Sequence, residues 1–340
     1  MKQPIAKKTA KKLTIHKHTR IDNYYWLNNK DNSEVIDYLN EENKYCEAKL
    51  KHTENLQNEL YEEMVGRLDK EESSVPYLLD GYLYSQRYEK GKEYPVFGRK
   101  KQSEHSDDEE ILIDQNKLAK NHSFCAIGKL SVCSNNKILA YSIDFVSRRM
   151  YDIYFKNLQT GELLKDTIPN TSGGFAWASD GKTLFYAQKD EKTLRSNKIY
   201  KHIVGTDSKN DELIFIEEDE TFICNVYKSK SKKYIIIGSY STLSTEYRIV
   251  SSDQPNDEFK IFEPRQKNHE YSIEHKGDEF FIITNKDGSK NFKLMRCPID
   301  FTTSINWEQI IPNREDVLLE DMEVFDKFIV LNERQKGLTQ

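Results

Sequence analysis

A short segment recurs six times along this chain of 340 residues. Each copy is a turn followed by a run of aliphatic or aromatic residues, as in Asp80-Gly-Tyr-Leu-Tyr-Ser and Lys182-Thr-Leu-Phe-Tyr-Ala. The copies begin at residues 80, 137, 182, 233, 279 and 327, so they lie 45 to 57 residues apart. A strand unit that repeats at about 40–50 residues is typical of a β-propeller blade, which cannot bury its faces without neighbours.

The repeat predicts a mainly β chain with an incomplete β-propeller of about five to six blades. The last copy begins at residue 327, so we expect the chain to end inside a blade. Residues 1–72 have a different pattern and predict an α-helical extension, which leaves 73–340 for the propeller, truncated at its C-terminal end. Turn residues such as Ser179-Asp180-Gly181 precede the repeated strands at equivalent positions, which supports a true repeat.

Two amphipathic helices are predicted in the extension. Asp31 and Glu34 resemble a capping box at the start of the first helix. In the second, Leu56, Leu60 and Met64 follow at four-residue steps and stop near Gly66. The apolar stripes of these helices need a surface to cover them, and both the rim of the propeller and a domain outside this chain are open alternatives.

Composition and charge exclude several classes of protein. The net charge is −5 with both signs interspersed, so no basic stripe indicates nucleic-acid binding. The five cysteines are widely spread without a CxxC pair, which predicts free thiols in a reducing cytoplasm. No uninterrupted apolar stretch approaches 18 residues, so we expect a soluble cytoplasmic protein that does not enter a membrane.

Glycine spacing tests for the common catalytic and nucleotide-binding motifs. No two of the 14 glycines lie two, four or five residues apart, which excludes G-x-G-x-x-G, G-x-S-x-G and a strict P-loop. His269-Glu270 begins like a metalloprotease helix, but Ile273 stands where the second histidine belongs. The sequence therefore predicts no catalytic residue, no metal site and no cofactor within this chain.

At many positions the chain resembles oligopeptidase B, a cytoplasmic peptidase of the prolyl oligopeptidase family. The similarity covers essentially the whole sequence. It includes the stretches Pro4-Ile-Ala-Lys-Lys, Arg20-Ile-Asp-Asn-Tyr24-Tyr25-Trp26-Leu27, Leu60-Tyr61-Glu62-Glu63-Met64-Val65-Gly66-Arg67, Gly91-Lys-Glu-Tyr94-Pro95-Val96, Asp144-Phe-Val-Ser-Arg148-Arg149 and Asp316-Val-Leu-Leu319-Glu320-Asp321.

This resemblance implies a seven-bladed propeller between an N-terminal extension and a C-terminal α/β-hydrolase domain. In the family, the hydrolase domain holds the Ser-Asp-His triad and the pockets for Arg or Lys side chains. None of those positions exists in this chain, so the resemblance transfers no catalytic residue and predicts inactivity for the chain alone. It implies short peptides as substrates of the complete enzyme, and a hydrolase domain as partner chain or missing half.

Two groups of residues receive a role from the resemblance. Arg148 and Arg149 match an arginine pair on the propeller face toward the hydrolase domain, which implies ion pairs between domains that couple closure to assembly of the site. An ordinary surface pair is the competing interpretation. Tyr24, Tyr25 and Trp26 are expected to anchor the extension.

Two functions remain open from the sequence. In the first, the chain is the propeller part of an oligopeptidase B-like serine peptidase and gates the access of short peptides that are cleaved after Arg or Lys. In the second, it is an autonomous binding or scaffold propeller without peptidase activity. The second requires a closed ring, because an open one leaves exposed strand edges.

Overall fold

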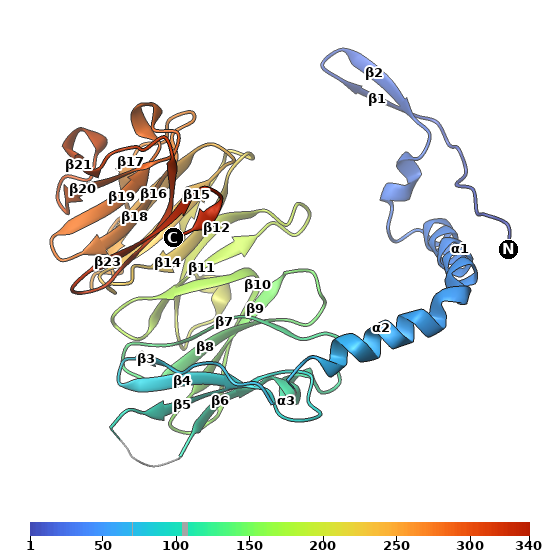
Figure 1. Cartoon of the computed structure of the whole chain (residues 1–340), viewed down its shortest axis with the longest axis horizontal. Coiled ribbons are helices and arrows are strands. Elements are labelled where there is room, and N and C mark those ends of the chain that lie inside the picture. The colour runs from blue at the N-terminus through green and yellow to red at the C-terminus, as the bar shows by residue number, and fades with distance from the viewer. Residues whose placement is uncertain (70, 104–107) are drawn as a thin grey trace. The chain divides into compact units, whose positions relative to one another are not determined.

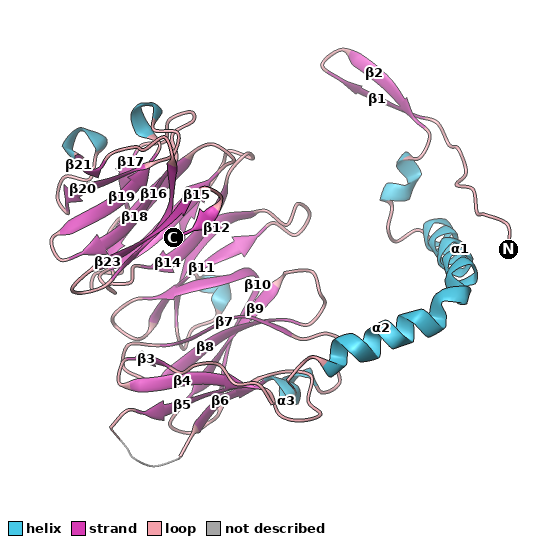
Figure 2. Cartoon of the chain, viewed as in Figure 1, coloured by secondary structure: helices cyan, strands magenta, loops and turns pink. Residues whose placement is uncertain are grey.

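The computed structural model describes residues 1–69, 71–103 and 108–340. Contacts divide the chain into two compact units, Met1–Lys70 and Glu71–Gln340. Figures 1 and 2 show the difference between them, because helices dominate the first unit and strands the second.

The first unit consists of a β-hairpin followed by helices. The hairpin turns at His16 and Lys17, which both have positive φ angles. The elements of this unit are β1 (Lys11–Ile15), β2 (His18–Asp22), the 3-10 turn η1 (Tyr25–Asn28), α1 (Ser33–Leu50), the 3-10 turn η2 (Lys51–Thr53) and α2 (Glu54–Gly66).

The helix boundaries test the sequence signals. Helix α2 ends at Gly66, as predicted. The capping residue of α1 is Asn32, whose Oδ1 accepts from the backbone N–H of Glu34 at 2.9 Å, so the predicted cap at Asp31 is wrong by one residue. Val35 is the buried residue of the two helices, while Leu56, Leu60 and Met64 of α2 are exposed.

The second unit is built from antiparallel sheets in chain order, one of which has seven strands. Because its middle strand, β10 (Leu163–Trp177), bends between two halves, we describe those halves as two sheets, which gives six in all (Figure 1). The first contains β3 (Tyr77–Leu79), β4 (Tyr82–Arg87), β5 (Val96–Lys101) and β6 (Glu110–Asp114). The second contains β7 (Ala126–Val132), β8 (Ile138–Asp144), β9 (Tyr151–Asn157) and the start of β10 (Leu163–Trp177). The third contains the end of β10, β11 (Thr183–Lys189), β12 (Ser196–Ile203) and β13 (Glu212–Ile216).

The remaining three sheets follow the same order. The fourth contains β14 (Ile223–Lys228), β15 (Tyr234–Tyr240), β16 (Thr245–Ser251) and β17 (Lys260–Glu263). The fifth contains β18 (Tyr271–Lys276), β19 (Glu279–Thr284), β20 (Lys293–Pro298) and β21 (Glu308–Ile311). The sixth contains β22 (Val317–Val324), β23 (Ile329–Gln335) and β24 (Leu338–Thr339). Short helical turns are α3 (Gln115–Ala119), η3 (Ser208–Asn210), η4 (Lys286–Gly288) and η5 (Ser304–Asn306).

Strand β10 belongs to two sheets. Its first part pairs with β9 and its last part pairs with β11, with register shifts on both sides. Thr171 lies at the change and is opposite both Tyr151 and Gln188. Asn170 and Gly173 beside it have positive φ angles, which allow the strand to bend from one sheet into the next.

The six repeated segments of the sequence all form the second strand of a sheet, namely β4, β8, β11, β15, β19 and β23. The predicted incomplete propeller is therefore confirmed, with six sheets of which the last has three strands. First strands of neighbouring sheets contact each other, as β10 and β14 do, so they lie innermost. An ion pair between Lys232 and Asp80 also joins the fourth and first sheets.

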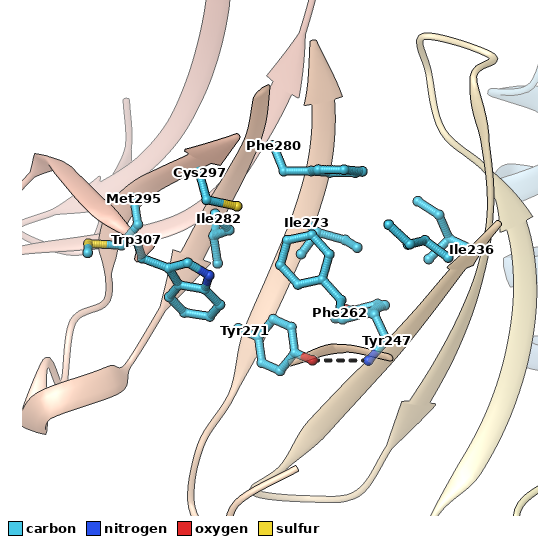
Figure 3. Packing of buried hydrophobic residues seen from close by; sticks show 11 residues of the cluster. Ile236, Tyr247, Phe262, Tyr271, Ile273, Phe280, Ile282, Met295, Cys297 and Trp307 are labelled. Carbon is cyan, nitrogen blue, oxygen red and sulfur yellow. Dashed lines mark hydrogen bonds between the residues drawn. The ribbon is translucent and has the colours of Figure 1, made fainter. Parts of the chain in front are cut away.

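The core consists of five apolar layers, each between two successive sheets. Figure 3 shows the layer between the fourth and fifth sheets, in which the rings of Phe262 and Phe280 meet edge-on with 5.0 Å between their centres. In the same layer the Tyr271 hydroxyl accepts from the backbone N–H of Tyr247 at 3.1 Å. The described residues form no sixth layer between the last sheet and the first, so each of these two sheets has one face without a partner.

Replacement of Phe280 by Ala should destabilise the propeller strongly. This side chain is fully buried between two sheets, so its loss leaves a cavity that costs about 3–5 kcal/mol of unfolding free energy. Urea denaturation of the 340-residue chain measures the change. The matched control is Phe301→Ala, whose side chain is 61% exposed and should cost less than about 0.5 kcal/mol. Equal losses in the two variants would contradict the layer as the source of stability.

Candidate functional site on the proximal face

The sheets of the second unit have two ends, and the chain enters the unit at one of them. Residues before β3 run beside the end of β4, since Ser74 donates to the carbonyl of Gln86 and Tyr88 to that of Glu72, both at 2.8 Å. Because strands alternate in direction, this end also carries the sheet-to-sheet connections and the loops between second and third strands. We call it the proximal face, and the opposite end the distal face.

Arg148 and Arg149 lie on the proximal face, in the loop between β8 and β9. The buried carboxylate of Asp144 shapes this loop, because it accepts from the backbone N–H groups of Val146 at 2.8 Å and Arg149 at 2.7 Å. The Lys189 ammonium donates to the Arg149 carbonyl at 2.6 Å. Both arginine side chains are exposed, and neither has an ion-pair partner within the described residues.

A buried cluster of charged side chains stabilises the loops of the same face. The Arg265 guanidinium donates to both carboxylate oxygens of Glu217, at 3.2 and 2.6 Å, and to Glu246 at 3.2 Å. Glu217 lies between the third and fourth sheets. Glu246 lies near the start of β16, and Arg265 follows β17. Arg265 also lies 4.1 Å from the ring centre of Phe222. The cluster thus fastens two sheet-to-sheet connections to each other.

The charges of this cluster change the ionisation of its members. Burial by itself would raise the pKa of the Glu246 carboxyl, but a hydrogen bond from the Arg265 backbone N–H, the Arg265 guanidinium and the charge of Arg248 outweigh burial and lower that pKa. Glu246 is 4% exposed and Glu217 is 3% exposed. Glu246 therefore stays charged, and both carboxylates are paired with Arg265, since an unpaired buried charge is costly.

The three aromatic residues expected to anchor the extension lie in the first unit. Trp26 donates from Nε1 to the Lys7 carbonyl at 2.8 Å, and its ring meets Tyr38 of α1 edge-on at 6.2 Å. The Lys11 ammonium lies 3.6 Å from the centre of the Tyr25 ring. Tyr24 is exposed. Trp26 and Tyr25 thus hold the N-terminal segment within its own unit, and an anchoring role toward another domain stays a prediction.

Residues 4–340 match the sequence profile of the prolyl oligopeptidase N-terminal β-propeller domain. The chain belongs to the prolyl oligopeptidase family. It is 37% identical to dipeptidyl aminopeptidase BI of Pseudoxanthomonas mexicana over 98% of this chain. It is 34% identical to protease 2 of Moraxella lacunata over 100% of this chain. Those matches cover 48% and 50% of the two relatives.

Solved structures of the prolyl oligopeptidase family agree with this assignment. Oligopeptidase B of Leishmania major superposes with a TM-score of 0.93 at 28% identity, over 99% of this chain and 50% of the other. Oligopeptidase B of Trypanosoma brucei, solved in a closed form with covalently bound antipain, superposes with a TM-score of 0.91. The chain spans about half the length of the relatives that it matches.

Two other kinds of site are absent from residues 1–69, 71–103 and 108–340. No group of three or more His, Cys, Asp or Glu residues there could hold a metal ion. No helix in that part of the chain is long and apolar enough to cross a membrane. Sequence reasoning missed the Arg265 cluster, because its partners come from different loops and no local spacing joins them. It also missed the role of Asp144, although the hydrogen bonds of Asp144 to Val146 and Arg149 lie within one loop.

Replacement of Glu246 by Gln should reduce stability in a pH-dependent way. At pH 7 we expect a loss of about 1–3 kcal/mol of unfolding free energy, because the neutral amide pairs less well with Arg265. The folded-state pKa of Glu246 lies below its ordinary value, so its contribution is complete above the unfolded pKa of about 4.3 and is lost as pH falls through the folded pKa.

Urea denaturation at pH 7 and at pH values below 4 measures this difference. The gap between wild type and Glu246→Gln should shrink as the pH falls. The exposed Glu258→Gln variant serves as the control and should cost little at any pH. A gap that widens toward low pH would show that Glu246 is not held as a paired carboxylate.

Proposed function

We propose that this chain is the substrate-filtering half of an oligopeptidase B-like serine peptidase that cleaves short peptides after Arg or Lys. The observation that carries the proposal is the match of residues 4–340 to the family propeller, together with the TM-score of 0.93 to oligopeptidase B. The Ser-Asp-His chemistry comes from a hydrolase domain outside these 340 residues. As in oligopeptidase B, the complete enzyme is expected to act in the cytoplasm.

The surfaces of both units support a partner of this kind. In the first unit, Leu56, Leu60 and Met64 form an exposed apolar stripe on α2, which an isolated helix in water would not retain without a cover. In the second unit, the described residues form no apolar layer over one face of the first sheet and one face of the last. Under this proposal the hydrolase domain covers the helices of 1–72. A further sheet lies between the first and last sheets of the propeller in 73–340 and covers the free face of each.

The proposed filter selects substrates by their size. A rigid propeller whose proximal face lies over a catalytic centre leaves only a narrow path to that centre. A short flexible peptide can pass along such a path, but a folded domain cannot. Arg148 and Arg149 lie on this face with exposed guanidinium groups, so ion pairs from them to the hydrolase domain would hold the filter in place.

A second candidate activity is removal of dipeptides from a free N-terminus. It is favoured by the relative at 37% identity, dipeptidyl aminopeptidase BI. The two activities separate on the substrate, because an oligopeptidase accepts a blocked N-terminus and a dipeptidyl aminopeptidase requires a free one.

Peptide hydrolysis should appear only when this chain is combined with a hydrolase half. The test co-expresses the chain with the C-terminal half of protease 2 from Moraxella lacunata and measures cleavage of a fluorogenic Arg-Arg peptide, with its N-terminus either blocked or free. Each half alone should be inactive. Cleavage by this chain alone would contradict the proposal, and silence from a folded, co-purified pair would favour the scaffold propeller instead.

Replacement of both Arg148 and Arg149 by Ala should lower kcat/KM of the combined halves by about three- to tenfold, because each exposed ion pair contributes about 0.2–1 kcal/mol. The loss should be largest at low ionic strength. The control removes the same charge from the distal face with Lys137→Ala and Lys182→Ala, both in turns between first and second strands. An equal loss in the control would reject a specific role for the arginine pair.

A further inference from the structure

The loop between β8 and β9 has a costly backbone conformation. Ser147 and Arg149 have φ angles of 59° and 55°, in the left-handed region that residues with a side chain rarely adopt. A residue stays in this region only where its surroundings hold it there, and such residues are frequent at clamps and switch regions. The loop therefore requires contacts that outweigh the cost of its backbone.

Asp144 makes two of these contacts from the end of β8. Its carboxylate oxygens have separate tasks, since Oδ1 accepts from the Val146 N–H at 2.8 Å and Oδ2 accepts from the Arg149 N–H at 2.7 Å. The Asp144 side chain is buried, so water does not compete for these bonds. An asparagine in its place has one carbonyl oxygen and one NH2 group, so it can accept only one of the two bonds in this arrangement.

Lys189 holds the other side of Arg149. It lies at the end of β11 in the neighbouring sheet, and its ammonium donates to the Arg149 carbonyl at 2.6 Å. Side chains from two sheets thus bind both the N–H and the C=O of Arg149. Within the described residues, no comparable pair of hydrogen bonds holds the backbone of Arg148. Arg149 is therefore the more firmly fixed of the two arginines.

The loop and its contacts have an excess of positive charge. Arg148, Arg149 and Lys189 contribute three cations, and the buried carboxylate of Asp144 is already engaged by two backbone N–H groups. Burial, followed by the charge of Arg149, lowers the pKa of Lys189, whereas the charge of Asp144 opposes this shift. The exposed cations outnumber the one buried anion, so a carboxylate is the complementary group on a partner.

We propose that Asp144 and Lys189 are positioning residues, which fix Arg149 so that its guanidinium meets a carboxylate of the hydrolase domain. A guanidinium on a fixed backbone loses less entropy when it pairs than one on a mobile loop, so more of the attraction remains for binding. Arg149 then contributes the larger part of the arginine contact and Arg148 the smaller part. The identity of the partner rests on the proposed function, whereas the fixed loop rests on contacts within this chain.

Hydrogen exchange of the 340-residue chain tests the fixed loop without any partner. Mass spectrometry follows exchange in residues 144–151. Asp144→Asn should accelerate exchange of the Arg149 N–H by about tenfold or more, because a buried hydrogen bond to a charged group is lost. Lys189→Met leaves Asp144 intact and should change exchange in the same direction, so it keeps the test valid if Asp144→Asn does not fold.

The matched control is Asp180→Asn, which makes the same chemical change in a turn on the distal face. Asp180 accepts there from the N–H groups of Lys182 at 3.0 Å and Thr183 at 2.9 Å. This variant should accelerate exchange in its own turn and leave residues 144–151 like wild type. Unchanged exchange at 144–151 in Asp144→Asn and Lys189→Met, or an equal acceleration there in Asp180→Asn, would overturn the proposal.

Peptide hydrolysis by the combined halves tests whether Asp144 acts through Arg149. At low ionic strength Asp144→Asn should lower kcat/KM by about threefold, and it should cause no further loss when Arg149→Ala is already present. The effect of Asp144→Asn should also shrink at high salt, because an exposed ion pair transmits it. A purely structural role would instead lower kcat/KM equally with and without the Arg149 side chain and at every salt concentration, which would overturn the proposal.

The two experiments separate the possible failures. Inactive combined halves would contradict the proposed function and with it the carboxylate partner, while hydrogen exchange would still decide whether Asp144 and Lys189 fix Arg149. Active halves together with unchanged exchange in the loop would reject the positioning role alone and leave the proposed function intact.

Discussion

Burial of sheet faces between neighbouring sheets is the constraint on which the second unit depends. A single twisted sheet of three or four strands exposes two faces, and no sheet of this propeller covers its own. Five apolar layers solve this problem for the inner sheets, and residues such as Phe155, Phe185 and Phe280 are fully buried only because a second sheet lies against them. The stability of each sheet is therefore shared with its neighbours, as in other repeat proteins.

The apolar layers determine the geometry of the proximal face. Loops that are far apart in the sequence meet there because the sheets beneath them are packed together. Arg265, Glu217 and Glu246 then fix the loops by charged hydrogen bonds that are protected from water. The first unit is organised differently, since α1 and α2 have Val35 as their buried residue and exposed apolar stripes. Such helices require a covering surface to be stable, whereas the propeller has a core of its own.

The comparisons separate the role of this propeller from the chemistry of its relatives. One relative is named for release of dipeptides and another as a protease, yet the chain aligns with both over nearly its whole length. The match to the family propeller therefore does not by itself specify an activity, because function depends on particular sites and not on the fold.

The sequence by itself determined the elements, and the tertiary structure decided how they combine. Apolar runs after turn residues identified all six second strands, and Gly66 marked the end of α2, because these signals depend on neighbouring residues. The cap of α1 fell on Asn32 instead of Asp31, since several residues there can accept the same bond. The division of β10 between two sheets and the contact of Arg265 with Glu217 were absent from any local pattern. Each depends on residues that only the packing of sheets brings together.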